Sequence, residues 1–246
     1  MRLVLAATLA SITPGQLLAQ SIARTSDGKP DLSGIWQAVT TATWNLQAHA
    51  AEKDVPAGLG IVDGNEIPYQ PWALTKQKDN HANRATADPE RRCYLPGVPR
   101  VMYMPYPFQI FQTAQHMAMT FEYTHVVRRI FMNSPHAAGP IEWYMGDSRG
   151  RWEGDTLVVD VVHFTDKTWF DRAGNFHSPA LHVVERYTPM GPNHIQYEAT
   201  IEDPKVFTRP WNISFPLYRR LEKNLRILEY ECYAFGFEHT WLTSPQ

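Results

Sequence analysis

The sequence has little cysteine: only Cys93 and Cys232 occur among its 246 residues. Neither stands in a CxxC motif or beside a histidine at the spacing of a zinc or thiol redox site, which excludes both kinds of cysteine site. An even number of cysteines permits one disulfide in an oxidising compartment. Two buried free thiols are the alternative.

No segment approaches the roughly 20 consecutive apolar residues that a membrane-spanning helix needs. Residues 1–19 begin with one positive charge, Arg2, continue as a short apolar run broken at Pro14, and end at Ala19. This pattern predicts a signal peptide cut near Ala19 and a periplasmic or secreted protein without a stable membrane span. A retained anchor is the alternative, because Leu17 replaces the small residue expected before the cut.

Basic residues are not in excess. Removing Arg2, the one charged residue of the first 19, from the 23 basic residues leaves 22 against 25 acidic residues. This balance argues against nucleic acid as a partner, and a small molecule is the expected one. With 43% apolar and 20% charged residues, the chain can build a sizeable core. We therefore expect residues 20–246 to form one domain, whose oligomeric state stays open.

Motifs for phosphate and dinucleotide binding are also missing, because the glycines at residues 146–154 fit neither spacing. The pentapeptide GDSRG at residues 146–150 has the letters of a serine hydrolase elbow. The residues after it predict a hairpin instead of the helix that such an elbow needs. Ser148 is therefore interpreted as a turn residue, and no organic cofactor is expected.

From residue 101 onward the chain is rich in Val, Ile, Tyr, Phe and Thr, in segments separated by Gly, Pro, Asn and Asp. This composition is typical of β-strands. HIQYEATIE, residues 194–202, alternates apolar and polar residues, which predicts a strand with one buried face. The predicted strands are a first one at residues 34–36 and further ones at residues 117–132, 156–164, 181–187, 194–202, 211–220 and 226–235.

Successive hairpins without intervening helices favour an antiparallel meander, and about eight or more strands favour its closure into a barrel. A β-sandwich is the alternative. The turn at residues 153–156 predicts one of the hairpins. Residues 40–100 have no clear period apart from a helix predicted from Pro71 to Asn83. We expect them to form an irregular and partly helical excursion.

Several runs carry a resemblance to known proteins. DGKPDLSGIW, RRCYLPGVPR, GDSRGRWEGDTLVVD, FTDKTWFDRAGNFHS, VVERY and TIEDPKVFTRPW resemble a family of secreted bacterial proteins that are commonly left as hypothetical. This resemblance covers nearly all of the chain after residue 19 and implies no particular activity. A weaker resemblance, to lipocalin-like barrels, rests on Gly34-x-Trp36 at the first strand. It implies an all-β, lipocalin-like barrel with a small-molecule cavity, but no particular reaction.

The segment FTDKTWFDRAGNFHS, residues 164–178, is the strongest candidate for one wall of an active site. Turn formation explains its Asp and Gly residues but not Lys167, Trp169 and His177, and these three carry the hypothesis of an active site. Asp171 is predicted to accept a ring N–H of His177, so that the other ring nitrogen acts as a general base. Trp169 would stack on a planar or sugar substrate. A solvated loop tip is the alternative.

A second group lies on the strand predicted around His125. In a regular strand Tyr123, His125 and Arg129 share one face, which suits the wall of a cavity. His125 can exchange a proton near neutral pH, and Arg129 can hold a carboxylate, phenolate or enolate. Trp143 would line the same pocket. Glu185 would act as an acid if it points inward without a partner, although a paired, structural glutamate is the commoner case.

These expectations give three hypotheses for function. The first is an acid/base enzyme, a lyase, hydratase or isomerase without a cofactor, that acts on a small aromatic or carbohydrate-like molecule. In it His125 and His177 move protons, Asp171 orients, and Lys167 and Arg129 stabilise negative charge. The second is a non-catalytic, lipocalin-like binding protein. The third is a metal-dependent enzyme, although no two histidines have the spacing that places both on one ion.

Overall fold

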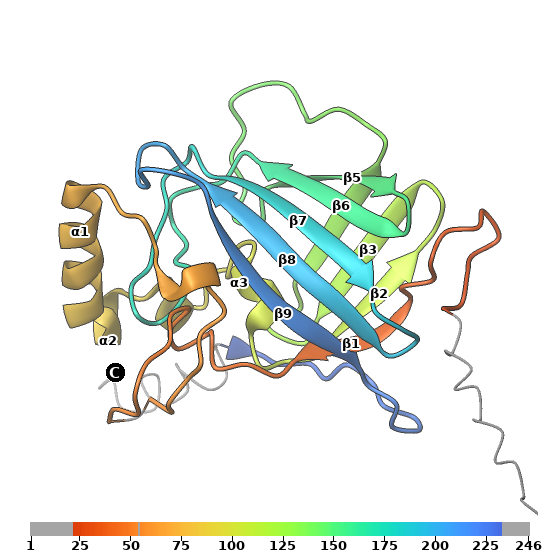
Figure 1. The fold of residues 1–246 in the computed structure, drawn as a ribbon, viewed down its shortest axis with the longest axis horizontal. Coiled ribbons are helices and arrows are strands. Elements are labelled where there is room, and N and C mark those ends of the chain that lie inside the picture. Colours follow the sequence, from red (N-terminus) through yellow and green to blue (C-terminus); the bar gives the residue numbers. More distant parts are fainter. Residues whose placement is uncertain (1–21, 54, 233–246) are drawn as a thin grey trace, which may run out of the picture.

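The computed structural model describes residues 22–53 and 55–232, so the predicted signal peptide lies outside the described residues. Nine strands follow one another around a closed barrel (Figure 1). The barrel expected from the sequence is therefore confirmed. The strands are β1 (Gly34–Ala38), β2 (Phe108–Gln112), β3 (His116–Phe121), β4 (Val127–Met132), β5 (Asp147–Glu153), β6 (Thr156–Val162), β7 (His182–Pro189), β8 (His194–Glu202) and β9 (Trp211–Arg219).

One pair of neighbouring strands departs from the antiparallel meander. β4 and β5 run parallel, with Ile130 opposite Ser148. The other neighbouring pairs are antiparallel. Because parallel strands start at the same end, residues 133–146 must return from one end of the barrel to the other. They form the green loop that rises from the barrel in Figure 1.

Two of the predicted strands are partly wrong. Residues 117–132 form two strands, because Thr124 and His125 adopt positive φ angles of 51° and 53° in a turn between β3 and β4. Residues 226–232 contain no strand and meet the barrel through a single bridge between Tyr123 and Tyr230. The rest of that predicted strand, residues 233–235, lies outside the described residues. β2 is additional to the predicted strands.

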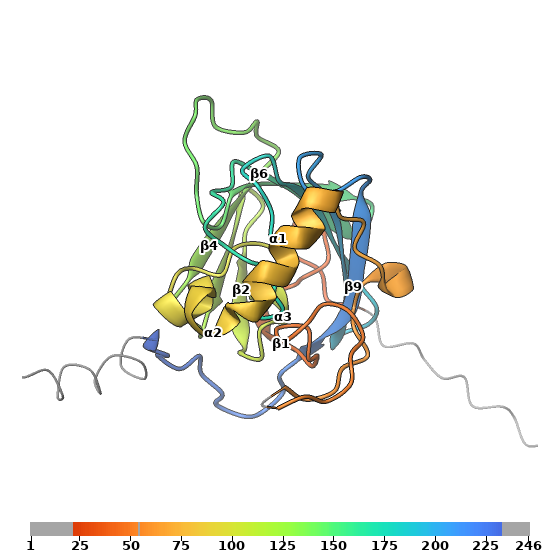
Figure 2. The same cartoon turned by 90° about the vertical axis from the view of Figure 1, so that its left-hand side faces the viewer.

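The two ends of the barrel differ. We call the end where β1, β3, β6 and β8 finish the covered end, because the long connections 39–107, 163–181 and 203–210 lie there. Figure 2 looks onto this end and shows α1 lying across it. The first connection contains η1 (Asp63–Asn65), α1 (Pro71–Ala82), α2 (Arg84–Ala87), η2 (Pro89–Arg92) and α3 (Arg100–Tyr103). Pro71 opens α1, as predicted.

The opposite end, which we call the turn end, is closed by Trp36 and Arg219. Trp36 is 1% exposed and donates its indole N–H to the carbonyl of Leu32 at 2.9 Å. The Arg219 guanidinium lies 4.2 Å from the centre of the Trp36 ring, a cation–π contact. Gly34 has a φ of +131°, and a Cβ there would overlap Nη1 of Arg219. Both features explain the glycine of Gly34-x-Trp36.

The barrel interior follows the expected strand alternation. In β8 the side chains of Ile195, Tyr197, Ala199 and Ile201 are buried, while the intervening residues face outward. β8 therefore presents one apolar face to the core and one polar face to solvent. The outward positions of β5 to β8 near the covered end are the ones that carry the candidate site.

Cys93 and Cys232 form a disulfide with a sulfur–sulfur distance of 2.08 Å across 139 residues of sequence. The predicted bridge is therefore confirmed, and it fastens residues 220–232 beside the covered end. Within the described ranges, no helix is both long and apolar enough to cross a membrane.

Candidate functional site

His177 lies in the interior of the covered end. It is 3% exposed, its Nδ1 donates to the carbonyl of Ser178 at 3.0 Å, and its Nε2 accepts from the hydroxyl of Thr168 at 2.7 Å. Burial lowers the pKa of His177, so the ring is neutral. Because the ring is buried and lines none of the cavities described below, no substrate reaches it.

Asp171 does not orient His177. It is fully buried and accepts four hydrogen bonds of 2.6 to 3.1 Å, from the backbone N–H groups of Leu46, Ala173 and Asn175 and from the Asn175 amide. Burial raises the pKa of Asp171 to about 6, against the effect of these donors. The carboxylate ties the 164–178 loop to the start of the 39–107 connection, and the expected pair with His177 is not formed.

The turn after β3 separates the residues expected on one strand face. Tyr123 is buried, with its ring 5.4 Å from that of Tyr106. The His125 side chain is 43% exposed and lies 3.4 Å from Glu231. Arg129 faces solvent, and its neighbour on the chain points into the barrel instead. The shared face predicted for Tyr123, His125 and Arg129 is therefore wrong, because the turn resets the alternation.

Glu185 points into the barrel and is paired. Both of its carboxylate oxygens accept from Arg128, and Oε1 also accepts from the hydroxyls of Tyr187 and Tyr197 at 3.0 and 2.8 Å. Arg128 donates in addition to Ser148 at 3.1 Å. All five side chains are buried. This is the paired, structural arrangement that the sequence left open, and it provides no free acid.

The remaining predicted residues of the 164–178 loop are apart from one another. Lys167 is exposed at the tip of the loop, whereas the Trp169 ring packs into the core and its carbonyl accepts from Arg100 at 3.3 Å. None of the cavities described below is lined by Lys167, Asp171, His125 or His177. The structure does not bring the four predicted catalytic residues together in one of them.

A different set of acids and bases lies on the outer wall near the covered end. It is built from the 133–146 loop and from outward positions of β5 to β8. His182 lies directly opposite Glu202, and Asp160 is diagonal to His182 in the pairing of β6 with β7. Opposite and diagonal positions on one face of a sheet are within side-chain reach. We call this set the histidine array; its members are His136, Asp147, Asp160, His182 and Glu202.

Four contacts link the array into a chain. From Glu202 through His182, Asp160 and His136 to Asp147, the nitrogen–oxygen distances are 3.3, 3.0, 2.8 and 2.9 Å. A carboxylate oxygen only accepts, so each contact is a hydrogen bond when the facing ring nitrogen carries a proton. The array can therefore hold protons on two imidazoles, each flanked by two carboxylates.

The two carboxylates that contact His136, Asp147 and Asp160, are held in the charged form. Burial acts to raise the pKa of Asp147, but hydrogen bonds from Arg149, Ala137 and His136 outweigh it and lower that pKa. Burial likewise acts to raise the pKa of Asp160, and the bonds from its two histidines lower it. With both rings protonated, Arg149 and the two histidines balance the three carboxylates of the array.

His163 lies beside the array with an unoccupied ring. Its ring centre is 6.2 Å from that of His136 and 5.9 Å from that of Trp143. Neither of its ring nitrogens has a hydrogen-bond partner among the residues that the structure describes. Its φ of +62° is uncommon outside glycine, and such strained positions cluster at functional sites. Trp143 was predicted to bind substrate. Its backbone N–H donates to the backbone carbonyl of His163 at 2.8 Å, which holds the backbone of residue 163 in place.

A surface cavity of about 350 Å³ brings His163 and His182 together, and we call it the His163 pocket. One of its imidazoles is free to accept a proton, and the other is supported by carboxylates and can donate one. A second cavity, of about 330 Å³, lies against His136 and Asp160. The other walls of the His163 pocket include Pro140, Ile141, Glu142, Pro179 and Leu181.

The array does not have the geometry of a metal centre. Within residues 22–53 and 55–232, no group of three or more His, Cys, Asp or Glu side chains is arranged to hold a metal ion. The ring nitrogens of the array face carboxylate oxygens rather than a common centre.

The sequence contained one signal for this site. Asp160 is the only charged residue in the apolar run TLVVDVV, which indicates that its side chain faces outward from the strand. His136 and His182 stand far from it along the chain; the register of β6 with β7 brings His182 to Asp160, and the 133–146 loop brings His136. Comparison with known proteins adds nothing to this assignment: no family model, no curated protein and no solved structure matches the chain.

Proposed function

We propose that this protein is an acid/base enzyme of the lyase, hydratase or isomerase type, and that its reaction takes place in the His163 pocket. The observation that carries the proposal is the pairing of a free imidazole, His163, with a carboxylate-supported imidazole, His182, in one cavity. Acid/base chemistry needs one group that takes a proton and another that gives one. His163, whose ring nitrogens have no partner among the described residues, is the group that takes a proton, and His182, which lies between two carboxylates, is the group that gives one.

In the proposed reaction His163 is the general base and removes a proton from a carbon atom of the substrate. In an elimination, the electrons of that C–H bond form a double bond while the C–O bond to a neighbouring hydroxyl breaks. The Nδ1–H of His182, whose contact with Glu202 is the longer of its two at 3.3 Å, leaves Glu202 and gives its proton to the departing hydroxyl, and water leaves. In an isomerisation, the proton taken by His163 returns to a different carbon. A positioned proton-transfer group contributes roughly 10² to 10⁴ in rate.

Asp160 and Glu202 are positioning residues in this scheme. They contact the two ring nitrogens of His182 at 3.0 and 3.3 Å, which fixes the orientation of the ring. Asp160 also contacts His136, so the rest of the array is the proposed source of a replacement proton. The array thus links the pocket to a second, solvent-facing histidine.

The cavity supports a small substrate with an apolar or planar body. Its volume of about 350 Å³ lies at the lower end of the usual range for ligand pockets. Proline, isoleucine and leucine form much of its wall, and the Trp143 ring lies behind His163. These features support the small aromatic or carbohydrate-like molecule expected from the sequence.

Export from the cytoplasm is part of the proposal. The pattern of residues 1–19 and the resemblance to secreted bacterial proteins support it. The disulfide between Cys93 and Cys232 also supports it, because such bonds persist in oxidising compartments.

The test is turnover of a panel of aromatic and sugar-derived hydroxy acids and hydroxy ketones, followed by proton NMR. We expect His163→Asn and His182→Gln each to lower kcat about 100-fold or more. Asparagine suits the positive φ of residue 163, so this variant should keep the fold. The matched control is His194→Asn, an exposed histidine at the turn end.

Two results would contradict the proposal. One is a wild-type rate in both variants for a substrate that the protein converts. The other is ligand binding in the His163 pocket without any conversion across the panel, which would identify a binding protein instead.

A further inference from the structure

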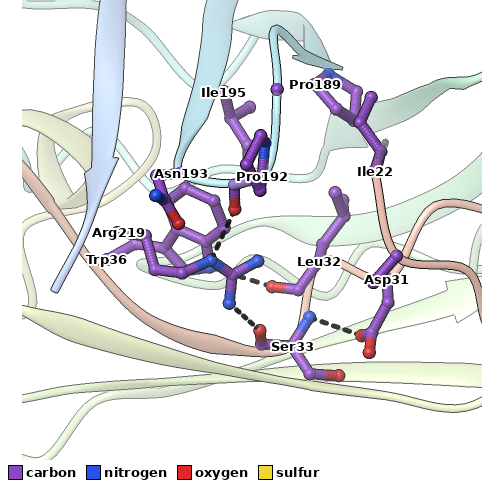
Figure 3. Close-up of a pocket in the computed structure, with 12 residues that line it drawn as sticks. Ile22, Asp31, Leu32, Ser33, Trp36, Pro189, Pro192, Asn193, Ile195 and Arg219 are labelled. Carbon is purple, nitrogen blue, oxygen red and sulfur yellow. Dashed lines mark hydrogen bonds between the residues drawn. The ribbon is translucent and has the colours of Figure 1, made fainter. Parts of the chain in front are cut away.

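A third cavity, of about 260 Å³, lies at the turn end, far from the His163 pocket along the barrel (Figure 3). It is bounded on one side by residues 22–33 and on the other by the turn between β7 and β8. At roughly 30 Å³ per water, this space corresponds to about nine water molecules and suits a small ligand. Its apolar wall consists of Ile22, Leu32, Trp36, Pro189 and Ile195.

Arg219 provides the charge in this cavity. Its Nε donates to the carbonyl of Pro192 at 2.8 Å, and its Nη1 donates to the carbonyl of Ser33. Its planar group lies 4.2 Å from the centre of the Trp36 ring. Figure 3 shows the guanidinium held between these groups at the edge of the cavity. The remaining terminal nitrogen, Nη2, has no hydrogen-bond partner in the described part of the chain.

This guanidinium lacks a paired counter-charge. No carboxylate of residues 22–53 or 55–232 forms an ion pair with Arg219, and Asp31 in the same wall uses one oxygen to accept from the Ser33 N–H at 2.9 Å. Burial lowers the pKa of Arg219, and the nearby charge of Asp31 opposes this only in part. Arg219 is a half-buried cation that three neighbours hold in place. It can therefore bind an anion with little further loss of side-chain freedom.

We propose that the turn-end cavity binds a small carboxylic acid with an aliphatic body. The carboxylate accepts from Nη2 of Arg219, and the aliphatic part lies against Leu32, Ile22 and Trp36. This site is separate from the acid/base chemistry of the outer wall, so either one can be present without the other.

Calorimetric titration of the full chain with hexanoate, and with uncharged hexanol as the matched ligand, tests this site. We expect hexanoate to bind at least about tenfold more tightly than hexanol, because a charge-assisted hydrogen bond is gained. In a ¹⁵N spectrum, hexanoate should shift the indole signal of Trp36. Arg219→Gln should remove the preference for hexanoate.

Two further variants keep the test decisive, because Arg219 also supports Trp36 and its replacement can loosen the turn end. Ile22→Trp retains Arg219 but fills the cavity, so it should abolish binding of both ligands. Arg220→Gln removes a neighbouring charge that pairs with Glu222, and it should bind hexanoate as the wild type does. The proposal is overturned if hexanoate fails to bind the wild type, binds Ile22→Trp equally well, or is no better than hexanol.

Discussion

At the scale of single residues, His177 makes stability depend on pH. Burial lowers its pKa in the folded protein, whereas an exposed histidine in the unfolded chain titrates at about 6.5. Below that pH the unfolded chain binds a proton that the folded ring refuses, so the stability contributed above it is lost as the pH falls. The loss develops as the pH falls from about 7.5 to about 5.5, the range around the pKa of a histidine in the unfolded chain.

His177→Gln should remove this loss, since glutamine can donate to Ser178 and accept from Thr168 without titrating. Urea unfolding of both proteins at the two pH values measures it. The difference in the free energy of unfolding between wild type and variant should be smaller at the lower pH. A difference that does not change with pH would show that His177 titrates in the folded protein as it does in the unfolded chain, which contradicts the lowered pKa.

Asp171 is predicted to be the most sensitive carboxylate of the 164–178 loop. Asp171→Asn turns one acceptor oxygen into an N–H group that faces the donors of Leu46 and Asn175. We expect the free energy of unfolding to fall by roughly 1 to 3 kcal/mol. Asp166→Asn, on the exposed part of the same loop, is the control and should change stability by less than about 0.5 kcal/mol. Equal effects of the two changes would contradict the role of Asp171.

At the scale of elements, the pair of Arg128 on β4 and Glu185 on β7 joins two strands across the barrel interior. Glu185→Gln leaves a buried cation without its counter-charge and should lower the free energy of unfolding by about 3 to 5 kcal/mol. The double change Arg128→Met with Glu185→Leu removes both charges and should cost less than that single change. Denaturant unfolding of the wild type and the two variants decides it, and a double variant that loses as much as or more than Glu185→Gln would contradict the pairing.

The strands whose residues alternate were predictable, because one buried face leaves a period of two in the sequence. β8 and the hairpin of β5 and β6 are examples. The turn at Thr124 and His125 was only an alternative to a regular strand, since no glycine or proline marks it in the sequence and its positive φ angles come from the tertiary structure. The parallel pairing of β4 with β5 is likewise a long-range choice that local pattern does not encode.

The candidate site was less predictable than the fold. The 164–178 loop was predicted to be one wall of an active site because it is rich in chemically active residues. In the structure its His177 and Asp171 form hydrogen bonds that hold the covered end together. The array draws His136, Asp160 and His182 from three separate segments, which become neighbours only through the register of β6 with β7 and the course of the 133–146 loop. A polar residue that faces outward from an apolar strand was the only local sign of it.

At the scale of the whole molecule, the disulfide fastens the last described segment to the covered end. It closes 139 residues of chain, and loops of this length are stabilised mainly by the restriction of the unfolded state. Replacing Cys93 and Cys232 together by serine should lower the free energy of unfolding by about 2 to 5 kcal/mol while leaving the far-ultraviolet β-sheet spectrum unchanged. Loss of the β-sheet signal would show that the barrel cannot form without the bridge.

The central claim is that His163 removes a proton from carbon. Its most direct test is deuterium uptake at carbon, measured by mass spectrometry after wild type and His163→Asn are incubated in D₂O with the panel of hydroxy acids and hydroxy ketones. This measurement detects proton removal even when no net product forms. The assignment predicts at least one compound that exchanges about 100-fold or more faster with the wild type than with the variant. Equal exchange with both proteins for every compound would contradict it.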